Sequence, residues 1–598
     1  MKKLINLTID DQKIAVMEGT TILEAAKKSG INIPTLCYHE DLCIAGNCRI
    51  CIVEQENTRA LPAACATPVT EGMVISTTSS KVRNARKYLV ELLLSEHNAD
   101  CTACVKNRHC ELQTLAEQNH IREHTFIDLK FDKNYTIDKL SPAIIIDYSK
   151  CIRCQRCVRT CEEIQSISAL SAAYKGKDMK ITTFFEKPIN TVVCSTCGQC
   201  VAHCPTGALT EHFYIDEVWD AINNPDKHVV VQTAPSIRVA LGEEFGMPPG
   251  SIVTGKMVSA LKRIGFDSVE DTDFTADLTV IEEGNELLRR LKSKIVDKDP
   301  NVKLPMITTC SPAWVKYCEH AFPDQLDHLS TCKSPMSMFG ALSKTYYAEK
   351  FKIDPAKIVS VAIMPCIAKK FESNRPEMNA SGYRDTDYVL TTRELAVMIK
   401  QAGIDFNKLP ETNFDSLMGV ASGAGMIFGN SGGVMEAALR CAYEIVVGND
   451  IPFKDLSITP LHGSEGEIVE LSLTFRDTKP EWSFLEGVTV NLAHANMLSN
   501  AYKIMNEVKD GNSKYHFIEI MSCPNGCIGG AGQPLPTSRE KRAARKDAIY
   551  KGEKQIEIRK AQDNPQIVNV YDDYLGKPLE EKAHKLLHVP GFTPRKRH

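Results

Sequence analysis

The stretches CIRCQRCVRTC (residues 151–161) and CSTCGQCVAHCP (residues 194–205) share the spacing C-x2-C-x2-C-x3-C. They belong to a dense block of sixteen cysteines between Cys37 and Cys204, and seven more are scattered from Cys310 onward. The dense block can hold several metal clusters from local sequence. The scattered cysteines can meet only if a long fold brings distant segments together, so the chain uses sulfur in two different ways.

Composition places the chain among ordinary globular proteins. Its 598 residues are 43% hydrophobic and 24% charged, and they allow several domains of roughly 100–200 residues each. The net charge of −4 gives no sign of a nucleic-acid or anionic-membrane partner. The N-terminal stretch MKKLINLTIDDQKIAV lacks an uninterrupted apolar segment, and no stretch approaches the roughly 18 apolar residues of a membrane-spanning helix. We therefore expect a cytoplasmic protein with reduced thiols, in which clustered cysteines bind metal.

The two cysteine runs predict a domain of the bacterial ferredoxin type over residues 125–215. In such a domain two [4Fe–4S] cubes lie close together, because the fourth cysteine of each run ligates the cube of the other. Glu162 stands where the first run would otherwise continue with proline, which is a minor departure. The predicted ligands are Cys151, Cys154, Cys157, Cys161, Cys194, Cys197, Cys200 and Cys204.

Residues 1–78 predict a small β-grasp sheet with one helix packed across it. KLINLTIDDQKIAV is an alternating strand pair around a polar turn, and GTTILEAAKKSG is a helix with threonine at its cap and glycine at its end. Four cysteines then follow C-x10-C-x2-C-x13-C, which suits a [2Fe–2S] cluster and resembles the large iron–sulfur subunit of NADH dehydrogenase. Structural zinc is the alternative. The predicted ligands are Cys37, Cys48, Cys51 and Cys65, with Cys43 as a spare loop thiol.

Residues 79–124 predict a small helical domain that carries another cluster. The helix KVRNARKYLVELLLSEH has apolar residues every three or four positions and ends at His97. Three cysteines follow 4, 7 and 13 positions later, which predicts a [4Fe–4S] cluster held by His97, Cys101, Cys104 and Cys110. Zinc would accept the same ligands, but the neighbouring clusters favour iron. Residues 1–215 are thus predicted to form an electron-transfer chain of four centres, one [2Fe–2S] and three accessory [4Fe–4S] clusters.

The remaining residues, 216–598, contain no G-x-G-x-x-G dinucleotide fingerprint after a strand. The electron-transfer chain must therefore serve a metal site or another subunit. TTCSPAW (308–314), MPCIAKKFE (364–372) and EIMSCPNGCIGGAG (519–532) each place cysteine beside proline or glycine, where a loop can approach a cofactor closely. In combination and order they resemble the three signature loops of the [FeFe]-hydrogenases, TSCCPxW, MPCxxKxxE and ExMxCxxGCxxGGG. The resemblance implies a large α/β catalytic domain.

The resemblance also implies an H-cluster, a [4Fe–4S] cube joined to a two-iron unit that carries CO, CN⁻ and a bridging azadithiolate. By motif position Cys366, Cys523 and Cys527 match cube ligands, with Cys527 as the bridge to the two-iron unit. Lys369 matches the lysine that hydrogen-bonds a cyanide, which is a charge-assisted contact. The thioethers that pack on the two-iron unit in the family match Met364 and Met521.

One position departs from the family motif. The motif has two adjacent cysteines, of which the first relays protons and the second ligates the cube. Here Cys310 falls on the relay position and Ser311 on the ligand position. A serine hydroxyl titrates far above the thiol reference of about 8.5 and is a poor iron ligand at neutral pH. We therefore expect Cys310 to ligate the cube through a small loop shift, with Ser311 helping proton transfer. The alternative is that Cys310 keeps the relay role.

A proton channel is implied as well. Glu283, Glu286 and Arg290 in EEGNELLRR, with Ser330 in LSTCKSP, match the family's channel to the relay cysteine. Glu283 and Glu286 are three apart on a predicted helix and so share a face. Without the resemblance, a solvated carboxylate face would be the simpler interpretation. The other cysteines of this half are expected to be buried small hydrophobes: Cys318, Cys332 and Cys441.

The resemblance covers essentially the whole chain and implies an anaerobic [FeFe]-hydrogenase that interconverts 2H⁺ + 2e⁻ and H₂. We expect its electron partner to be ferredoxin or flavin-containing, NAD(H)-linked iron–sulfur subunits, so that the chain is part of a hetero-oligomer. One alternative is a non-catalytic electron-transfer subunit of an NADH or formate dehydrogenase, which would leave the three loops without a purpose. Another is a sensory or assembly protein with an altered site, which the serine at position 311 supports.

Overall fold

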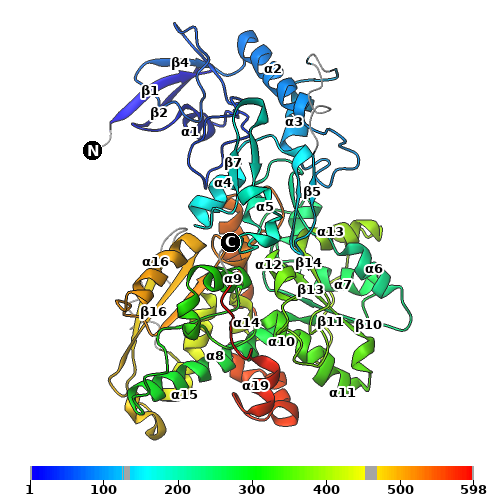
Figure 1. Ribbon diagram of the computed structural model, residues 1–598, viewed down its shortest axis with the longest axis vertical. Helices are drawn as coiled ribbons and strands as arrows, with labels where there is room; N and C mark the ends of the chain where they lie inside the picture. Colours follow the sequence, from blue (N-terminus) through cyan, green and yellow to red (C-terminus); the bar gives the residue numbers. More distant parts are fainter. Residues whose placement is uncertain (1–2, 124–125, 127–134, 452–467, 596–598) are drawn as a thin grey trace. The chain divides into compact units, whose positions relative to one another are not determined.

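The computed structural model describes residues 3–123, 126, 135–451 and 468–595 (Figure 1). The predicted boundary between the second and third domains, at residues 124–125, lies outside the described residues. The chain divides into two compact units. The N-terminal unit comprises Met1–Ile164, Ser168–Val192 and His203–Thr210, and the C-terminal unit comprises Gln165–Ile167, Val193–Ala202 and Glu211–His598.

The first sheet of the N-terminal unit contains the predicted strand pair. Its spatial order is β2 (Gln12–Met17), β1 (Leu4–Ile9), β4 (Met73–Ser76) and β3 (Glu54–Gln55). β1 and β2 are antiparallel. The predicted helix is α1 (Ile22–Lys28), where Thr21 and Glu24 form a reciprocal capping box at the start. Apolar side chains from both layers, such as Ile9 and Ile22, are fully buried between sheet and helix.

Helices and two small sheets complete the N-terminal unit. The predicted amphipathic helix is α2 (Ser80–Glu96), and His97 is its C-terminal cap residue as expected. The ferredoxin-like part has a three-stranded and a two-stranded sheet. The elements are α3 (Glu111–Gln118), β5 (Ile137–Asp138), β6 (Ile144–Asp147), α4 (Arg156–Arg159), β7 (Ser171–Ala173), β8 (Lys180–Thr182) and β9 (Leu209–Glu211). Helix α5 (Gln199–His203) belongs to the C-terminal unit except for its last residue.

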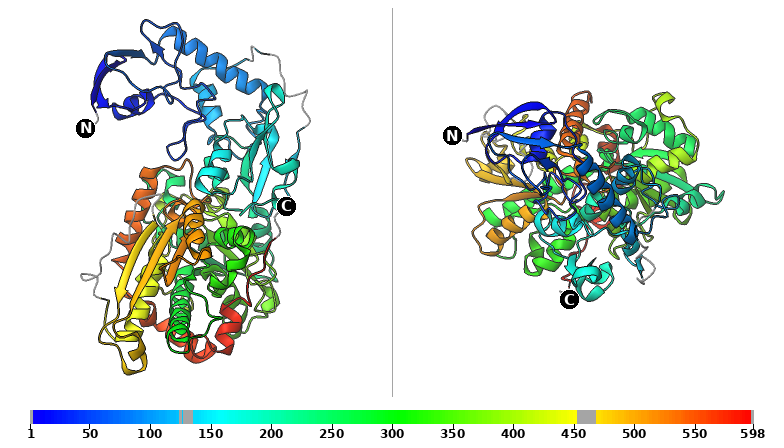
Figure 2. Two further views of the ribbon diagram at one scale, coloured as in Figure 1. Left: turned by 60° about the vertical axis from the view of Figure 1, so that its left-hand side comes forward. Right: turned by 90° about the horizontal axis from the view of Figure 1, so that it is seen from above.

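The C-terminal unit is built on two four-stranded sheets. The first has the order β11 (Ser268–Asp271), β10 (His228–Thr233), β13 (Ile358–Met364), β14 (Tyr388–Thr391), and all its pairings are parallel. The second has the order β12 (Met306–Ile307), β17 (Phe517–Met521), β16 (Thr489–Asn496), β15 (Ile468–Thr474), with only β15 antiparallel among them (Figure 2). Every residue of β13 is buried, as expected for a parallel sheet covered on both faces.

Helices surround these sheets. The longest is α8 (Thr272–Ile295), which contacts α10, α14 and α15 and is buried along most of its length. The helices of this unit are α6 (Ile215–Ile222), α7 (Thr254–Ile264), α8, α9 (Pro312–Ala321), α10 (Pro335–Leu342), α11 (Ala348–Phe351), α12 (Ala368–Glu372), α13 (Thr392–Gln401), α14 (Gly423–Ile427), α15 (Gly433–Val447), α16 (Leu498–Lys509), α17 (Arg539–Glu553), α18 (Pro565–Val570) and α19 (Glu581–Leu587).

The three signature loops leave the sheets at equivalent positions. Each begins at the C-terminal end of a parallel strand: TTCSPAW after β12, the cysteine of MPCIAKKFE after β13, and that of EIMSCPNGCIGGAG after β17. Loops at the carboxyl ends of parallel strands form the binding crevice of open α/β sheets. The topology therefore brings the scattered cysteines to one place. Within the residues described, no helix is both long and apolar enough to cross a membrane.

Candidate active site

The three loops line one cavity in the C-terminal unit. It encloses about 80 Å³ and has almost entirely apolar walls. Five cysteines line it, Cys197, Cys310, Cys366, Cys523 and Cys527, together with Ser311, Lys369, Met364, Met521 and Pro235. Met364 and Met521 are the last residues of β13 and β17 and are 3% and 4% exposed, so strand ends rather than mobile loops position both thioethers.

The cavity thiols influence one another: Cys523 is buried, and Cys310, Cys366 and Cys527 are half-buried. Burial raises the pKa of Cys523 and that of Cys527, the latter to about 12, and in both cases the neighbouring Cys366 adds to the effect. A protein interior does not gather several thiols in a dry pocket without a partner, since burial opposes their ionised form. Soft sulfur ligands in such a pocket fit an iron–sulfur cluster.

Glycines let the loops close tightly around this cavity. A β-carbon on Gly530 would lie 2.2 Å from the carbonyl oxygen of Pro365, and one on Gly526 would lie 2.6 Å from the backbone nitrogen of Ser431. Gly526 also has a φ of 85°, which side chains rarely adopt. The MPCIAKKFE and EIMSCPNGCIGGAG loops thus approach each other backbone to backbone.

Lys369 reaches this cavity from α12. Its Nζ lies 2.7 Å from a carboxylate oxygen of Glu372 and donates a hydrogen bond of 3.1 Å to the carbonyl oxygen of Cys310. The ammonium group is therefore held between two loops rather than exposed to solvent. It is positioned to donate to an anionic or strongly dipolar ligand in the cavity.

Cys310 and Ser311 have different surroundings. The Ser311 hydroxyl lies 2.7 Å from the hydroxyl of Ser522, and the Ser522 N–H donates to Ser311 Oγ at 3.3 Å. Cys310 is half-buried, desolvation raises the pKa of its thiol, and the Glu283 carboxylate is the next largest cause. Ser311 thus lies beside the loop that carries Cys523, whereas Cys310 lies toward α8.

Three of the four predicted channel residues, Ser330, Glu286 and Arg290, are joined by hydrogen bonds, and Glu283 lies one helical turn from Glu286 on α8. Ser330 Oγ donates to Glu286 Oε2 at 2.9 Å, and Arg290 donates to Glu286 Oε1 at 2.7 Å and 3.1 Å. Glu283 and Glu286 are each 1% exposed, so the interpretation of this helix face as solvated is wrong. Burial, and next the Glu286 carboxylate, raises the pKa of Glu283 to about 8.

A second, wider pocket adjoins the outer end of this group of residues. It has a volume of about 510 Å³, and its lining includes Glu286, Arg290, Lys303, Asp327 and Thr331. Because Glu286 lines this pocket and also accepts from buried Ser330, it joins the surface to the protein interior.

The N-terminal unit gathers its cysteines into three sets. The Cys37 N–H donates to Cys48 Sγ at 3.4 Å, and the sulfurs of Cys51 and Cys65 are 3.3 Å apart. In the second set, Cys101 and Cys104 both raise the pKa of Cys110, after burial, and His97 is the residue at the end of α2. The third set lines one apolar cavity of about 30 Å³: Cys151, Cys154, Cys157 and Cys204.

The third set combines three cysteines of the first run with the last cysteine of the second run, the crossed arrangement expected from the spacing. Cys194, Cys197 and Cys200 belong to the C-terminal unit and are buried. Within that unit Cys197 packs against Cys366 and lines the main cavity.

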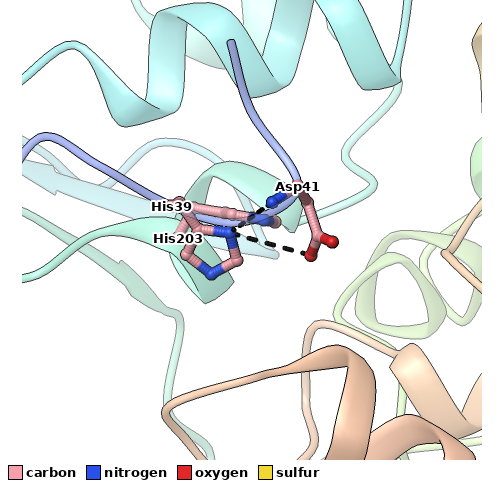
Figure 3. A group of neighbouring side chains, drawn as sticks. All are labelled: His39, Asp41 and His203. Carbon is pink, nitrogen blue, oxygen red and sulfur yellow. Dashed lines mark hydrogen bonds and ion pairs between the residues drawn. The ribbon is translucent and has the colours of Figure 1, made fainter. Parts of the chain in front are cut away.

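The structure also shows polar neighbours that the sequence did not indicate. His39, Asp41 and His203 lie together in the N-terminal unit (Figure 3). The His39 and His203 rings are 4.4 Å apart in an edge-to-face arrangement, and the Asp41 N–H donates to His39 Nδ1 at 3.3 Å. In the C-terminal unit, Ser522 contacts Ser311, and Cys332 contacts Glu286 and His588. Cys318, Cys332 and Cys441 are buried as expected, but Cys332 is thus more than a small hydrophobe.

Family models match most of the chain. "Iron only hydrogenase large subunit, C-terminal domain" covers residues 227–531, and "Iron hydrogenase small subunit" covers residues 539–590. Toward the N-terminus, "2Fe-2S iron-sulfur cluster binding domain" covers residues 2–80, "NADH-ubiquinone oxidoreductase-G iron-sulfur binding region" covers residues 86–125, and "NADH-quinone oxidoreductase subunit 3, ferredoxin-like domain" covers residues 141–210.

Relatives match over the full length. The NADP-reducing hydrogenase subunit HndD of Solidesulfovibrio fructosivorans is 47% identical over 98% of this chain and 99% of its own. Iron hydrogenase 1 of Clostridium pasteurianum is 38% identical over 96% and 97% of the two chains. The solved structure of a variant of the apo [FeFe]-hydrogenase HydA1 from Chlamydomonas reinhardtii is 39% identical with a TM-score of 0.57, and the match covers 64% of this chain and 99% of that one.

These matches agree with the cavity and its loops. The cavity is lined by thiols at the ends of parallel strands, a buried lysine and two thioethers, and all of them come from the three loops that resemble the signature loops of the family. The chain belongs to the [FeFe]-hydrogenase family, and it is an oxidoreductase that interconverts 2H⁺ + 2e⁻ and H₂ with electrons relayed through iron–sulfur clusters.

Proposed function

We propose that the cavity at the ends of β12, β13 and β17 holds an H-cluster and that Cys366, Cys523 and Cys527 ligate its cube. The observation that carries this proposal is the convergence of these thiols, from loops more than 150 residues apart in sequence, on one apolar cavity. When bound, the group supplies a redox-active iron site at which H₂ is split or formed. The chain's own residues bind it, exclude water and move protons.

Lys369 is the cation that orients the group. It is buried and fixed by Glu372 and the carbonyl oxygen of Cys310. Its charge would interact strongly with a bound group because the surrounding cavity walls are apolar. Met364 and Met521 close the cavity with polarizable side chains that carry no strong hydrogen-bonding group and therefore do not compete with Lys369.

Ligation of the cube by Cys310 stays a prediction, and two contacts favour the reverse assignment. Ser311 hydrogen-bonds to Ser522, the residue directly before Cys523, and so could serve as a fourth ligand beside it. Cys310 lies where Glu283 influences its thiol. In the reverse assignment Cys310 relays protons and Ser311 completes the cube. A Ser311→Cys variant and a Cys310→Ala variant separate the two: the residue that ligates changes the electron paramagnetic resonance of the cube, and the residue that relays changes turnover alone.

Protons are proposed to travel between Cys310 and the outer pocket through Glu283, Ser330, Glu286 and Arg290. Ser330 and Arg290 both hydrogen-bond to Glu286. Glu283 has a pKa of about 8, so it can both give and take a proton near neutral pH, as a relay requires. Arg290 keeps the Glu286 carboxylate in place at the pocket.

Electrons are proposed to travel through one [2Fe–2S] and three accessory [4Fe–4S] clusters, held by the cysteine sets of residues 1–215 with His97. Support for the last step is the packing of Cys197 against Cys366. The fold of these parts is proposed to be of the β-grasp, small helical and bacterial ferredoxin types. The domain bounds 1–78, 79–124, 125–215 and 216–598 are proposed with them.

The electron partner is proposed to be a flavin-containing, NAD(H)-linked iron–sulfur subunit or ferredoxin, within a cytoplasmic hetero-oligomer. The matches to regions of NADH-quinone oxidoreductase support this proposal. The name of the relative from Solidesulfovibrio fructosivorans, an NADP-reducing hydrogenase subunit, points to a pyridine nucleotide partner of the same kind.

The deciding experiment loads the purified chain with the two-iron unit under anaerobic conditions. We expect infrared bands of CO and CN⁻, about 20 iron atoms per chain, and H₂ evolution from reduced viologen. Cys523→Ala should abolish the bands and the activity, whereas Cys318→Ala, at a buried cysteine outside the cavity, should keep both. If Cys523→Ala kept both the bands and the activity, the assignment would be wrong.

A further inference from the structure

A second group of metal-ligating side chains lies outside the cavity. Glu286, Cys332 and His588 offer ligand atoms within 4.8 Å of one another. All three are buried, with exposures of 1%, 2% and 3%. They come from α8, from the segment before α10 and from the segment after α19, so local sequence does not reveal the group.

The distances in this group match the edges of a zinc coordination tetrahedron. Cys332 Sγ lies 3.7 Å from Glu286 Oε2 and 3.8 Å from His588 Nδ1. Zn–S bonds of about 2.3 Å and Zn–O or Zn–N bonds of about 2.1 Å at tetrahedral angles place sulfur about 3.6 Å from the other ligand. The observed separations exceed this by only a few tenths of an ångström. A cation can therefore be accommodated by small side-chain rotations.

The histidine is oriented as a metal ligand would be. His588 Nε2 lies 3.0 Å from Glu282 Oε2, so the ring donates its Nε2 proton to a carboxylate and presents Nδ1 as an acceptor. Glu282 is itself held by the Tyr571 hydroxyl at 2.5 Å and the Leu579 N–H at 3.0 Å. A carboxylate behind the imidazole is the usual outer partner of a metal-binding histidine.

One hydroxyl now fills the space that a cation would use. Thr331 Oγ1 lies 2.8 Å from His588 Nδ1 and 3.5 Å from Glu286 Oε2. Rotation of this side chain would either clear the position or turn the hydroxyl oxygen toward a cation as a ligand. Thr331 and Glu286 both line the 510 Å³ pocket, which gives a cation a route to the group.

Formal charge also favours a divalent cation. Glu282, Glu286 and a metal-bound Cys332 thiolate carry three negative charges, and Arg290 pairs with the free oxygen of Glu286. A divalent cation together with this guanidinium balances them. By contrast, in the His39, Asp41 and His203 group the His39 Nδ1 already accepts a backbone N–H, and no sulfur is present.

We propose that Glu286 Oε2, Cys332 Sγ and His588 Nδ1 form a binding site for a zinc-class divalent cation, completed by the Thr331 hydroxyl or a water molecule. Sulfur, imidazole and carboxylate together select Zn²⁺ over Mg²⁺ or Ca²⁺, which prefer oxygen ligands. A bound cation would take the Glu286 oxygen to which Ser330 donates. A cation bound there would block the proposed proton path. This effect on proton transfer rests on the proposed function, whereas the binding of the cation does not.

Binding is tested on the cluster-loaded full chain under anaerobic conditions with ZnCl₂. We expect one additional zinc per chain with unchanged iron content, and X-ray absorption at the zinc edge with one sulfur neighbour and the rest nitrogen or oxygen. Cys332→Ser should weaken binding at least ~100-fold, and Glu282→Gln should weaken it ~10–100-fold with the same neighbours. The control, Cys441→Ser at another buried lone cysteine, should bind as the parent does.

Two results would overturn the proposal: no additional zinc at stoichiometric concentration, or an additional zinc that survives Cys332→Ser and His588→Gln alike. The His588→Gln variant serves as an independent test in case Cys332→Ser fails to fold. The effect of zinc on proton transfer is measured separately, as the dependence of H₂ evolution on zinc concentration. Zinc bound with one sulfur neighbour but without inhibition would leave the site in place and count against Glu286 as a proton carrier.

Discussion

Replacing Glu283 by glutamine tests the electrostatics of the buried face of α8. The pKa of this carboxyl is raised from 4.5 to about 8, first by burial and next by Glu286. A shift of roughly 3.5 pH units at about 1.4 kcal/mol per unit corresponds to about 5 kcal/mol. The folded state keeps the proton between pH 4.5 and 8 while the unfolded state releases it, so stability falls as pH rises through this window. Above pH 8 the folded state bears the whole free-energy cost of ionising the buried Glu283 carboxyl. The Glu283→Gln variant does not bear this cost.

The direct assay is an infrared titration of the protonated carboxyl C=O band. We expect a component with a midpoint near pH 8 that is missing in Glu283→Gln. Glu270, Asp277 and Glu519 also have raised pKa values, at about 7, 6 and 7, so the difference between parent and variant isolates Glu283. H₂ evolution, which needs the protonated acid, should decline as pH rises through 8 in the parent. A midpoint below pH 6, or identical spectra for the two proteins, would refute the reasoning.

Three further changes probe the cavity. Ser311→Cys should raise turnover, because a thiol replaces a less acidic hydroxyl, and it should change the resonance of the cube as well only if residue 311 ligates it; an unchanged or lower rate would contradict a role of residue 311 in ligation or proton transfer. Lys369→Met should lower retention of the two-iron unit at least ~10-fold in CO and CN⁻ band intensity, since a charge-assisted contact is lost, while Lys357→Met at the surface should not. Gly530→Ala should abolish cube binding, measured as iron content, because its β-carbon would lie 2.2 Å from the Pro365 carbonyl oxygen; full iron content would show that the loops can separate.

Much of the fold could be predicted where the signal is local. The strand pair β1–β2, helix α1 with its threonine cap and the end of α2 at His97 all depend on periodicity and capping within a few residues. The crossed cysteine set is likewise fixed by spacing. These features need no knowledge of the rest of the chain.

What escaped prediction depends on distant contacts. Without the family resemblance, which implies a proton channel, Glu283 and Glu286 look like a solvated face, because the residues that bury them come from elsewhere in the chain. Cys332 looks like a lone core thiol, yet it meets His588 across a separation of 256 residues. Ser522 contacts Ser311 across 211 residues. No periodicity or spacing encodes such pairings, because they arise only when the parallel strands are assembled.

The C-terminal segment adds a backbone bridge between Cys332 and His588, with Lys333 N–H donating to Leu587 and Val589 N–H donating to Thr331. Helices α17 and α19 lie within the region that matches a family described as a small subunit, residues 539–590. In this chain that segment belongs to the same polypeptide, so its docking is intramolecular and independent of protein concentration. If the backbone were cut near residue 537, the segment after the cut could dissociate from the rest of the protein. The catalytic activity would then depend on protein concentration.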